Sequence, residues 1–269
     1  MDEIARYNIE RWQALVEAQA LFSRPQLDLD PSQAQALLDP ERRLGDVAGK
    51  AVLCLASGGG QQSVAFALLG AHVTVVDLSE AQLQRDRQAA ARYGLDITVL
   101  QADMRDLSAL EAASFDIVYQ PYSLGFVPDA QVVFEQVARL LRLRGQYYFM
   151  CANPFVLGVA PQDWNGEGYT LKHPYIDGAE VRYDDQDWVY DRSASKAAIP
   201  APREFRHTLG ALVSGLVRCG FVIMHLSDEA GFTPDPNAEA GTWAHVLSVA
   251  PPWLSFWAMY RPDVLAEAG

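Results

Sequence analysis

Short apolar runs alternate with amphipathic segments along most of the chain. Runs typical of buried strands lie at residues 52–55, 73–77, 97–103, 115–119, 146–151, 221–226 and 253–260. Residues 61–69 predict a helix, and another follows residue 129, with an apolar face made by Val132, Val133, Phe134, Val137, Leu140 and Leu141. Strands that alternate with helices indicate an α/β fold with a mostly parallel, doubly wound sheet. We expect the last strand to run antiparallel.

Polar residues and glycines mark where several helices begin and end. Ser79 can cap a helix that Gly94 ends, and Asp129 and Thr208 can cap two later helices. At the N-terminus, residues 3–22 form an amphipathic pattern, and residues 32–38 indicate a short second helix.

Residues 153–202 interrupt this alternation. Loops longer than ~15 residues in a compact domain usually carry function or structure of their own. This segment is rich in aromatic and acidic residues, and the pattern over residues 181–190 suggests a hairpin. We interpret it as a cap over the substrate side of the sheet; the alternative is a solvated surface hairpin. The chain then divides into an N-terminal helical segment (1–49), a core (50–152), the cap insertion (153–202) and the C-terminal part of the sheet (203–269).

A glycine turn joins the strand at 52–55 to the helix at 61–69. Gly58, Gly59 and Gly60 allow a ligand to approach the backbone closely, and the following helix start would offer free N–H groups. The next strand ends in Asp77, at roughly the 20-residue spacing of a nucleotide-binding βαβ unit, where an acid can bind ribose hydroxyls. No glycine follows three positions after Gly60, as a dinucleotide site requires, and no Gly-Lys-Ser/Thr is present.

Asp103 and Met104 follow the third strand, and with this addition the order of features resembles the class I S-adenosylmethionine-dependent methyltransferases. The resemblance implies a Rossmann-like seven-stranded sheet that binds S-adenosylmethionine and releases S-adenosylhomocysteine. It places the methionine moiety at Gly58 and Gly60, the ribose at Asp77, and the adenine at Asp103 with Met104.

The resemblance also adds five further residues to the expected cofactor site, namely Ala56, Ser57, Gln62, Leu78 and Tyr119. The family often has an acid in the first strand and a glycine two residues later, whereas this chain has Cys54 and Ala56. A side-chain contact to the cofactor's amino group is therefore not expected there, and backbone carbonyls near Ala56 would have to replace it.

Two residues are candidates for catalysis. Tyr122 follows the fourth strand, where this superfamily usually brings the methyl group and the acceptor together, and its hydroxyl could orient an acceptor. His207 starts a helix after the cap and is the candidate general base. It lies in a Phe-x-His-Thr-Leu stretch that is similar to a group of small-molecule-type methyltransferases. A purely structural role is the alternative for both residues.

Four aromatic residues are candidates for binding the acceptor: Tyr7 and Trp12 in the N-terminal helix, and Trp164 and Trp188 in the cap. For Trp12, packing of the helix is the alternative. The predicted function is methyl transfer to an O, N or S atom of a small organic molecule. A protein or RNA methyltransferase and a non-catalytic S-adenosylmethionine-binding module are the alternatives.

Composition narrows the class of partner. The net charge is −13, with 21 basic and 34 acidic residues, which disfavours a broad nucleic-acid surface. The histidines and the three dispersed cysteines lack metal-ligand spacing, so no metal site is expected. An acidic N-terminus and no apolar run of ~18 residues predict a cytoplasmic protein without a membrane span. Either a monomer or a homodimer is compatible with the sequence.

Overall fold

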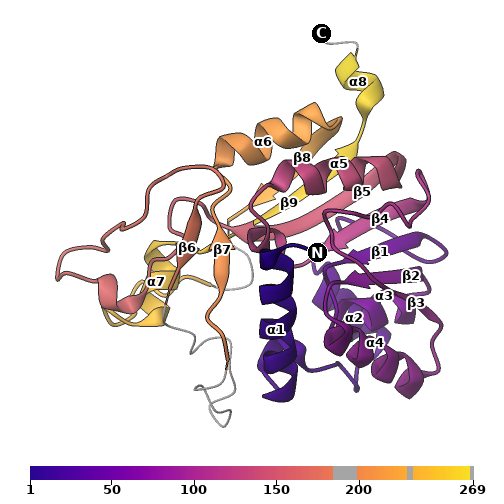
Figure 1. Cartoon of the computed structure of the whole chain (residues 1–269), viewed down its shortest axis with the longest axis horizontal. Helices are drawn as coiled ribbons and strands as arrows, with labels where there is room; N and C mark the ends of the chain where they lie inside the picture. Colours follow the sequence, from indigo (N-terminus) through magenta and orange to yellow (C-terminus); the bar gives the residue numbers. More distant parts are fainter. Residues whose placement is uncertain (184–198, 229–232, 267–269) are drawn as a thin grey trace.

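The computed structural model describes residues 1–183, 199–228 and 233–266 (Figure 1). The strands are β1 (Ala51–Leu55), β2 (His72–Asp77), β3 (Ile97–Gln101), β4 (Phe115–Gln120), β5 (Leu141–Ala152), β6 (Glu180–Arg182), β7 (Arg203–Phe205), β8 (Phe221–Ser227) and β9 (Trp253–Tyr260). The α-helices are α1 (Glu3–Glu17), α2 (Pro31–Leu38), α3 (Gln62–Leu68), α4 (Glu80–Tyr93), α5 (Ala130–Leu140), α6 (Leu209–Arg218), α7 (Trp243–Val249) and α8 (Pro262–Ala266). Short 3₁₀ helices are η1 (Leu21–Ser23), η2 (Leu124–Phe126) and η3 (Pro161–Asp163).

The main sheet has seven strands in the order β3-β2-β1-β4-β5-β9-β8. Neighbours from β3 to β5 pair in parallel, and β9 is antiparallel to both β5 and β8. The expected seven-stranded sheet with a reversed last strand is therefore confirmed. Strand order switches direction beside β1 and β4, and ligands of doubly wound sheets bind at the carboxyl ends of the strands at such a point.

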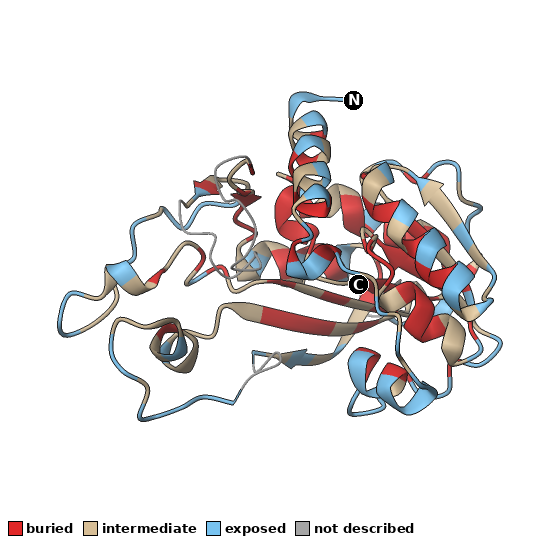
Figure 2. Ribbon diagram, turned by 90° about the horizontal axis from the view of Figure 1, so that it is seen from below, coloured by how far each residue is buried: buried red, intermediate tan, exposed pale blue. Residues whose placement is uncertain are grey.

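Helices bury both faces of the sheet. Side chains alternate along β1, so Leu53 and Leu55 pack on one face among residues of α5 and α6. Val52 and Cys54 pack on the other face among residues of α2, α3 and α4. Figure 2 shows the buried residues concentrated in the strands and on the inner sides of these helices. Because β1 is covered on both faces, it is a continuous apolar run rather than an alternating one.

The helix ends follow the predicted capping residues. Ser79, Asp129 and Thr208 accept backbone hydrogen bonds at the starts of α4, α5 and α6. Gly94 ends α4 in the left-handed conformation, as predicted.

The N-terminal helix is shorter than the expected 3–22. It ends at Glu17, and Gln19 takes a left-handed conformation with φ of 53°. The hydroxyl of Ser23 then donates to the carbonyls of Leu15 and Ala20, at 3.2 Å and 2.8 Å. These side-chain hydrogen bonds hold the chain in η1 instead of a further turn of α1.

A small second sheet joins β6, which lies in the cap segment, to β7, which follows that segment. In β6, Val181 pairs with Glu204 of β7, so the partner of this strand lies beyond the predicted end of the cap at residue 202. The expected hairpin over residues 181–190 falls largely on residues 184–198, outside the described residues. Helix α1 lies between this sheet and the core helices (Figure 1). Side chains of α1 contact β7 and the residues just before it. Tyr7 Oη donates to the Ala201 carbonyl at 2.7 Å, and Arg203 pairs with Glu3 at 2.9 Å.

Gly60 offers a test of the packing between the glycine turn and α4. It has a φ of 71°, and a Cβ there would lie 2.6 Å from the Arg85 carbonyl oxygen and 3.0 Å from Ala89 Cβ. Gly94 has a similar φ of 67° with nothing within 4 Å of such a Cβ. We expect Gly94→Ala to cost about 1–2 kcal/mol of unfolding free energy through backbone strain alone. Gly60→Ala should cost about 2–5 kcal/mol, because overpacking is added. Urea denaturation measures both; equal losses would show that the contact with α4 is not tight.

Candidate active site

A cavity of about 690 Å³ opens at the carboxyl ends of the parallel strands. Part of its wall comes from the segments that follow β1, β2, β3 and β4, and another part comes from β5 and β9. Residues of α1 and of the region around α2 also line it. Most of the predicted cofactor residues line it, namely Ala56, Ser57, Gly58, Gln62, Asp77, Leu78, Asp103, Met104 and Tyr119. Gly60 is predicted to bind the cofactor but does not line the cavity, because it packs against α4.

The first turn of the glycine loop is held by Asp77. The Gly58 N–H donates to Asp77 Oδ2 at 2.8 Å, and the Ser79 N–H donates to Oδ1 at 2.8 Å. Burial raises the pKa of Asp77, and these backbone hydrogen bonds oppose the rise. A Cβ on residue 58 would lie 2.7 Å from Gln82 Cβ, so only glycine fits between β2 and α4. The carboxylate is thereby held at the cavity wall.

The rest of the loop is held by Asp86, which sequence reasoning missed. Asp86 Oδ2 accepts from the Gly59 N–H at 2.9 Å, and Oδ1 accepts from the Gly60 N–H at 3.1 Å and from the Ser63 hydroxyl. The N–H groups of Gly59 and Gly60 are therefore used within the protein, whereas the free N–H groups that we expect are those at the start of α3. A signal was available, because Asp86 lies on the face of α4 that also carries Leu83 and is buried.

The two departures from the family pattern have different consequences. Cys54 is fully buried, and burial raises the pKa of its thiol well above the ordinary value. A neutral thiol thus stands where the family often has an acid. Ala56 has a φ of 47°, a left-handed conformation that favours glycine, and it lines the cavity. The backbone of Ala56 therefore takes the left-handed conformation typical of glycine, although alanine carries a Cβ.

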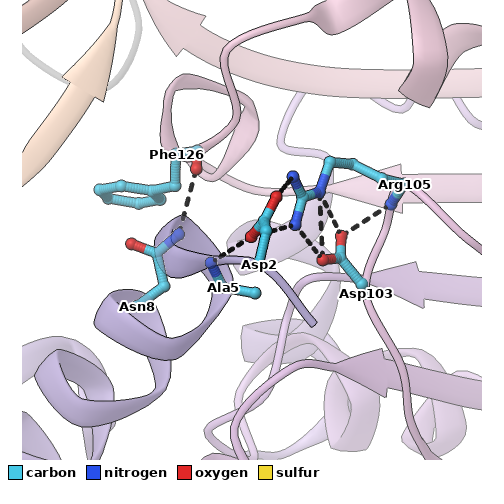
Figure 3. A network of polar contacts seen from close by, with 6 residues as sticks. All are labelled: Asp2, Ala5, Asn8, Asp103, Arg105 and Phe126. Carbon is cyan, nitrogen blue, oxygen red and sulfur yellow. Dashed lines mark hydrogen bonds and ion pairs between the residues drawn. The ribbon is translucent and has the colours of Figure 1, made fainter.

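A network of ionic contacts surrounds Asp103, the residue expected to bind the adenine (Figure 3). Arg105 Nη2 contacts Asp103 Oδ2 at 2.6 Å, and Arg105 Nη1 contacts Asp2 Oδ2 at 2.6 Å. Asp2 is also the N-cap of α1, because its Oδ1 accepts from the Ala5 N–H at 2.9 Å. Hydrogen bonding to Arg105 keeps the pKa of Asp2 well below its usual value. The start of α1 is therefore linked through Arg105 to Asp103 of the cavity wall.

A second contact fixes α1 one turn further along. Asn8 is buried, and its Nδ2 donates to the Phe126 carbonyl of η2 at 3.1 Å (Figure 3). The Trp12 ring packs edge-on against the Phe126 ring, with centroids 5.9 Å apart. Trp12 also lines the cavity, so its ring both packs α1 against η2 and forms part of the cavity wall.

The cavity wall also holds a buried carboxylate, Glu204 on β7. It is 1% exposed and accepts hydrogen bonds from Tyr122 Oη at 2.7 Å and Tyr183 Oη at 2.8 Å. Burial raises the pKa of Glu204, while the two hydroxyls and the nearby Arg11 oppose the rise. All four side chains line the cavity. Tyr122 was predicted, whereas Glu204 was missed although it lies in the same stretch as His207.

The candidate base His207 lies elsewhere. It is 5% exposed, does not line the cavity among the described residues, and its Nε2 is 3.0 Å from the Leu124 carbonyl oxygen. Burial lowers the pKa of its imidazole. The geometry thus places Glu204, rather than His207, beside Tyr122.

The other aromatic candidates are dispersed. The Tyr7 hydroxyl is bonded to the Ala201 carbonyl, and Trp164 packs against Tyr169 and His245 outside the cavity. Trp188 lies outside the described residues. The aromatic wall of the cavity comes instead from Tyr148 of β5 and from Trp253 and Trp257 of β9, along with Trp12.

Among residues 1–183, 199–228 and 233–266, no group of three or more His, Cys, Asp or Glu side chains is placed to hold a metal ion. No helix within these same ranges combines the length and the apolar character needed to cross a membrane. The three cysteines are free thiols.

Comparisons with known proteins agree with this geometry. A family described as a methyltransferase domain matches residues 53–149. The uncharacterized methyltransferase YbaJ of Bacillus subtilis is 30% identical over 83% of this chain and 86% of its own length. The chain belongs to the class I S-adenosylmethionine-dependent methyltransferases. It is therefore an enzyme that uses S-adenosylmethionine.

Two other relatives of this methyltransferase are informative. A putative S-adenosylmethionine-dependent methyltransferase from Listeria monocytogenes shares the fold, with a TM-score of 0.62, 19% identity, and coverage of 85% of this chain and 98% of that one. A ubiquinone biosynthesis O-methyltransferase of Aromatoleum aromaticum is 37% identical, but the match spans only 43% of this chain and 50% of that one.

The raised pKa of Asp86 leads us to expect that the free energy of unfolding depends on pH. Burial raises its pKa from the ordinary 3.8 to about 6, so the folded state binds this proton more tightly than the unfolded chain. The stability that Asp86 contributes is complete below pH 4 and is lost as the pH rises through about 6, by roughly 3 kcal/mol. In Asp86→Asn this loss should disappear. The measurement is the unfolding free energy of both proteins between pH 4 and pH 7; a constant difference between them would contradict the assignment.

We expect the contacts of Asp2 to stabilise the start of α1 locally. Asp2→Ala removes both the cap and the ion pair, so the exchange of α1 amide hydrogens should quicken about fivefold, as expected for about 1 kcal/mol. Asp2→Asn keeps a capping oxygen and loses only the charge, so the effect should be about twofold. Hydrogen exchange followed by mass spectrometry measures both variants, with the exposed Glu10→Gln as the control. Unchanged exchange in Asp2→Ala would show that α1 does not depend on this contact.

Proposed function

We propose that this methyltransferase acts on a small organic molecule, at an O, N or S atom. The observation that carries the proposal is one cavity whose lining includes both the predicted cofactor residues and aromatic side chains of β5 and β9. Its volume of about 690 Å³ lies within the range of small-molecule sites. A polymer substrate would need an open groove, and the net charge of −13 disfavours RNA.

The cofactor fits the glycine-loop end of the cavity. Asp77 offers carboxylate oxygens for the ribose hydroxyls, and Leu78 and Met104 offer apolar walls for the adenine. Asp103 would take the adenine amino group, with Arg105 beside it. When bound, S-adenosylmethionine supplies a methyl group on a positively charged sulfur, which is strongly electrophilic. The residues of this end therefore bind and orient, and positioning supplies most of the acceleration.

The acceptor would occupy the other end. Tyr148, Trp253 and Trp257 provide flat apolar surface, while Tyr122 and Glu204 provide polar groups at the end of β4. The partial match to a ubiquinone biosynthesis O-methyltransferase supports a small acceptor. Free thiols at all three cysteines accord with our prediction of a cytoplasmic enzyme.

The test is transfer of a labelled methyl group from S-adenosylmethionine to a panel of phenols, amines and thiols. We expect at least one class to be methylated. In Asp77→Asn the KM for S-adenosylmethionine should rise at least about tenfold, because a charged acceptor of two ribose hydrogen bonds is lost. The exposed Asp96→Asn is the matched control. Transfer to none of the three classes, with S-adenosylhomocysteine still bound, would overturn the small-acceptor proposal.

A further inference from the structure

We propose that Glu204 makes the neighbouring tyrosine hydroxyls accept hydrogen bonds from the methyl acceptor rather than donate them. The enzyme therefore selects an acceptor with an O–H or N–H group, and Glu204 takes the proton of that group. This inference rests on the proposed function and narrows the acceptor to a protic molecule. It assigns Glu204 as the final proton acceptor and Tyr122 as the residue that contacts the acceptor.

The argument begins with the hydrogens of two tyrosines. A carboxylate can only accept hydrogen bonds, and Glu204 takes one from Tyr122 and one from Tyr183. Each tyrosine has one hydroxyl hydrogen, and that hydrogen is used. What either oxygen can still offer a ligand is a lone pair. A ligand group beside them must therefore donate a hydrogen bond, and an ether, a ketone or a thioether would leave this need unmet.

Burial and charge strengthen this selection. Glu204 is 1% exposed, so water cannot easily substitute for either hydroxyl. Arg11 of α1 is also buried, lines the same cavity and stabilises the charged form of Glu204. The carboxylate is held on a paired strand, because Val181 of β6 pairs with Glu204. A fixed and desolvated acceptor keeps both hydroxyls in one orientation.

The proton balance of the reaction follows from the same contacts. As the acceptor oxygen or nitrogen forms its bond to the methyl carbon, its proton passes to Tyr122 Oη and the Tyr122 proton passes to Glu204 Oε2. The electron pair of the broken carbon–sulfur bond stays on sulfur. The negative charge of the carboxylate and the positive charge of the sulfonium are thus both removed, so the reacting groups are neutral afterwards.

A matched pair of ligands tests this without knowledge of the natural acceptor. The probes are 2-naphthol and 2-methoxynaphthalene, which differ only by the O–H hydrogen and a methyl group. We expect the wild-type protein, saturated with S-adenosylhomocysteine, to bind 2-naphthol at least about tenfold more tightly, measured by fluorescence titration. In Glu204→Gln the new amide donates to one tyrosine and frees its hydrogen, so the ratio should fall toward one. Tyr122→Phe should also lower it.

A spectroscopic signature separates proton acceptance from packing. Excited 2-naphthol is a strong acid, so the bound probe should show naphtholate emission in the wild type and lose it in Glu204→Gln. Binding of S-adenosylhomocysteine shows that each variant is folded, and Glu135→Gln on α5 is the control for the chemical change. A ratio near one in the wild type, or an unchanged ratio and emission in Glu204→Gln, would overturn the proposal. Because these are binding measurements, they stand apart from a failure of the labelled-methyl assay.

Discussion

The cofactor site of this enzyme depends on two carboxylates, half-buried Asp77 and buried Asp86, that accept the N–H groups of the glycine loop. Asp77 at the end of β2 holds Gly58, and Asp86 on α4 holds Gly59 and Gly60. Loss of Asp86 would leave the two buried N–H groups unpaired, which costs about 1–3 kcal/mol per group. The loop is therefore tied to a strand and a helix before any ligand binds. This arrangement gives the cavity a preformed wall rather than a flexible one.

The rest of the cavity is assembled from segments that are far apart in the chain. Asp2 and Asp103 meet through Arg105, and Tyr122 and Glu204 meet at the end of β4 (Figure 3 shows the first pair). Helix α1 is joined to Asp103 through its N-cap Asp2 and Arg105, and its residue Arg11 lines the cavity together with Glu204. The helix thus acts as a shared wall, and its position affects the cofactor end and the acceptor end together.

Local patterns predicted the scaffold well, because they depend on short-range physics. The apolar strands, the glycine turn, and the caps Ser79, Asp129 and Thr208 are each specified by a few neighbouring residues. Pairing between distant segments was not predicted, because β6 pairs with β7, which lies beyond the expected end of the cap at residue 202. His207 was favoured by its residue type, but the fold buries it beside Leu124.

By itself, the sequence determined the class of fold, the cofactor and the strand ends that carry Asp77, Asp103 and Tyr122. These follow from periodicity, glycine placement and a family resemblance, all of which are readable along the chain. Only the tertiary structure decided that Asp86 anchors the loop, that Arg105 joins α1 to Asp103, and that Glu204 lies beside Tyr122 in the cavity wall. The reason is physical: the role of a charged side chain depends on which partners share its buried surroundings, and those partners come from distant segments.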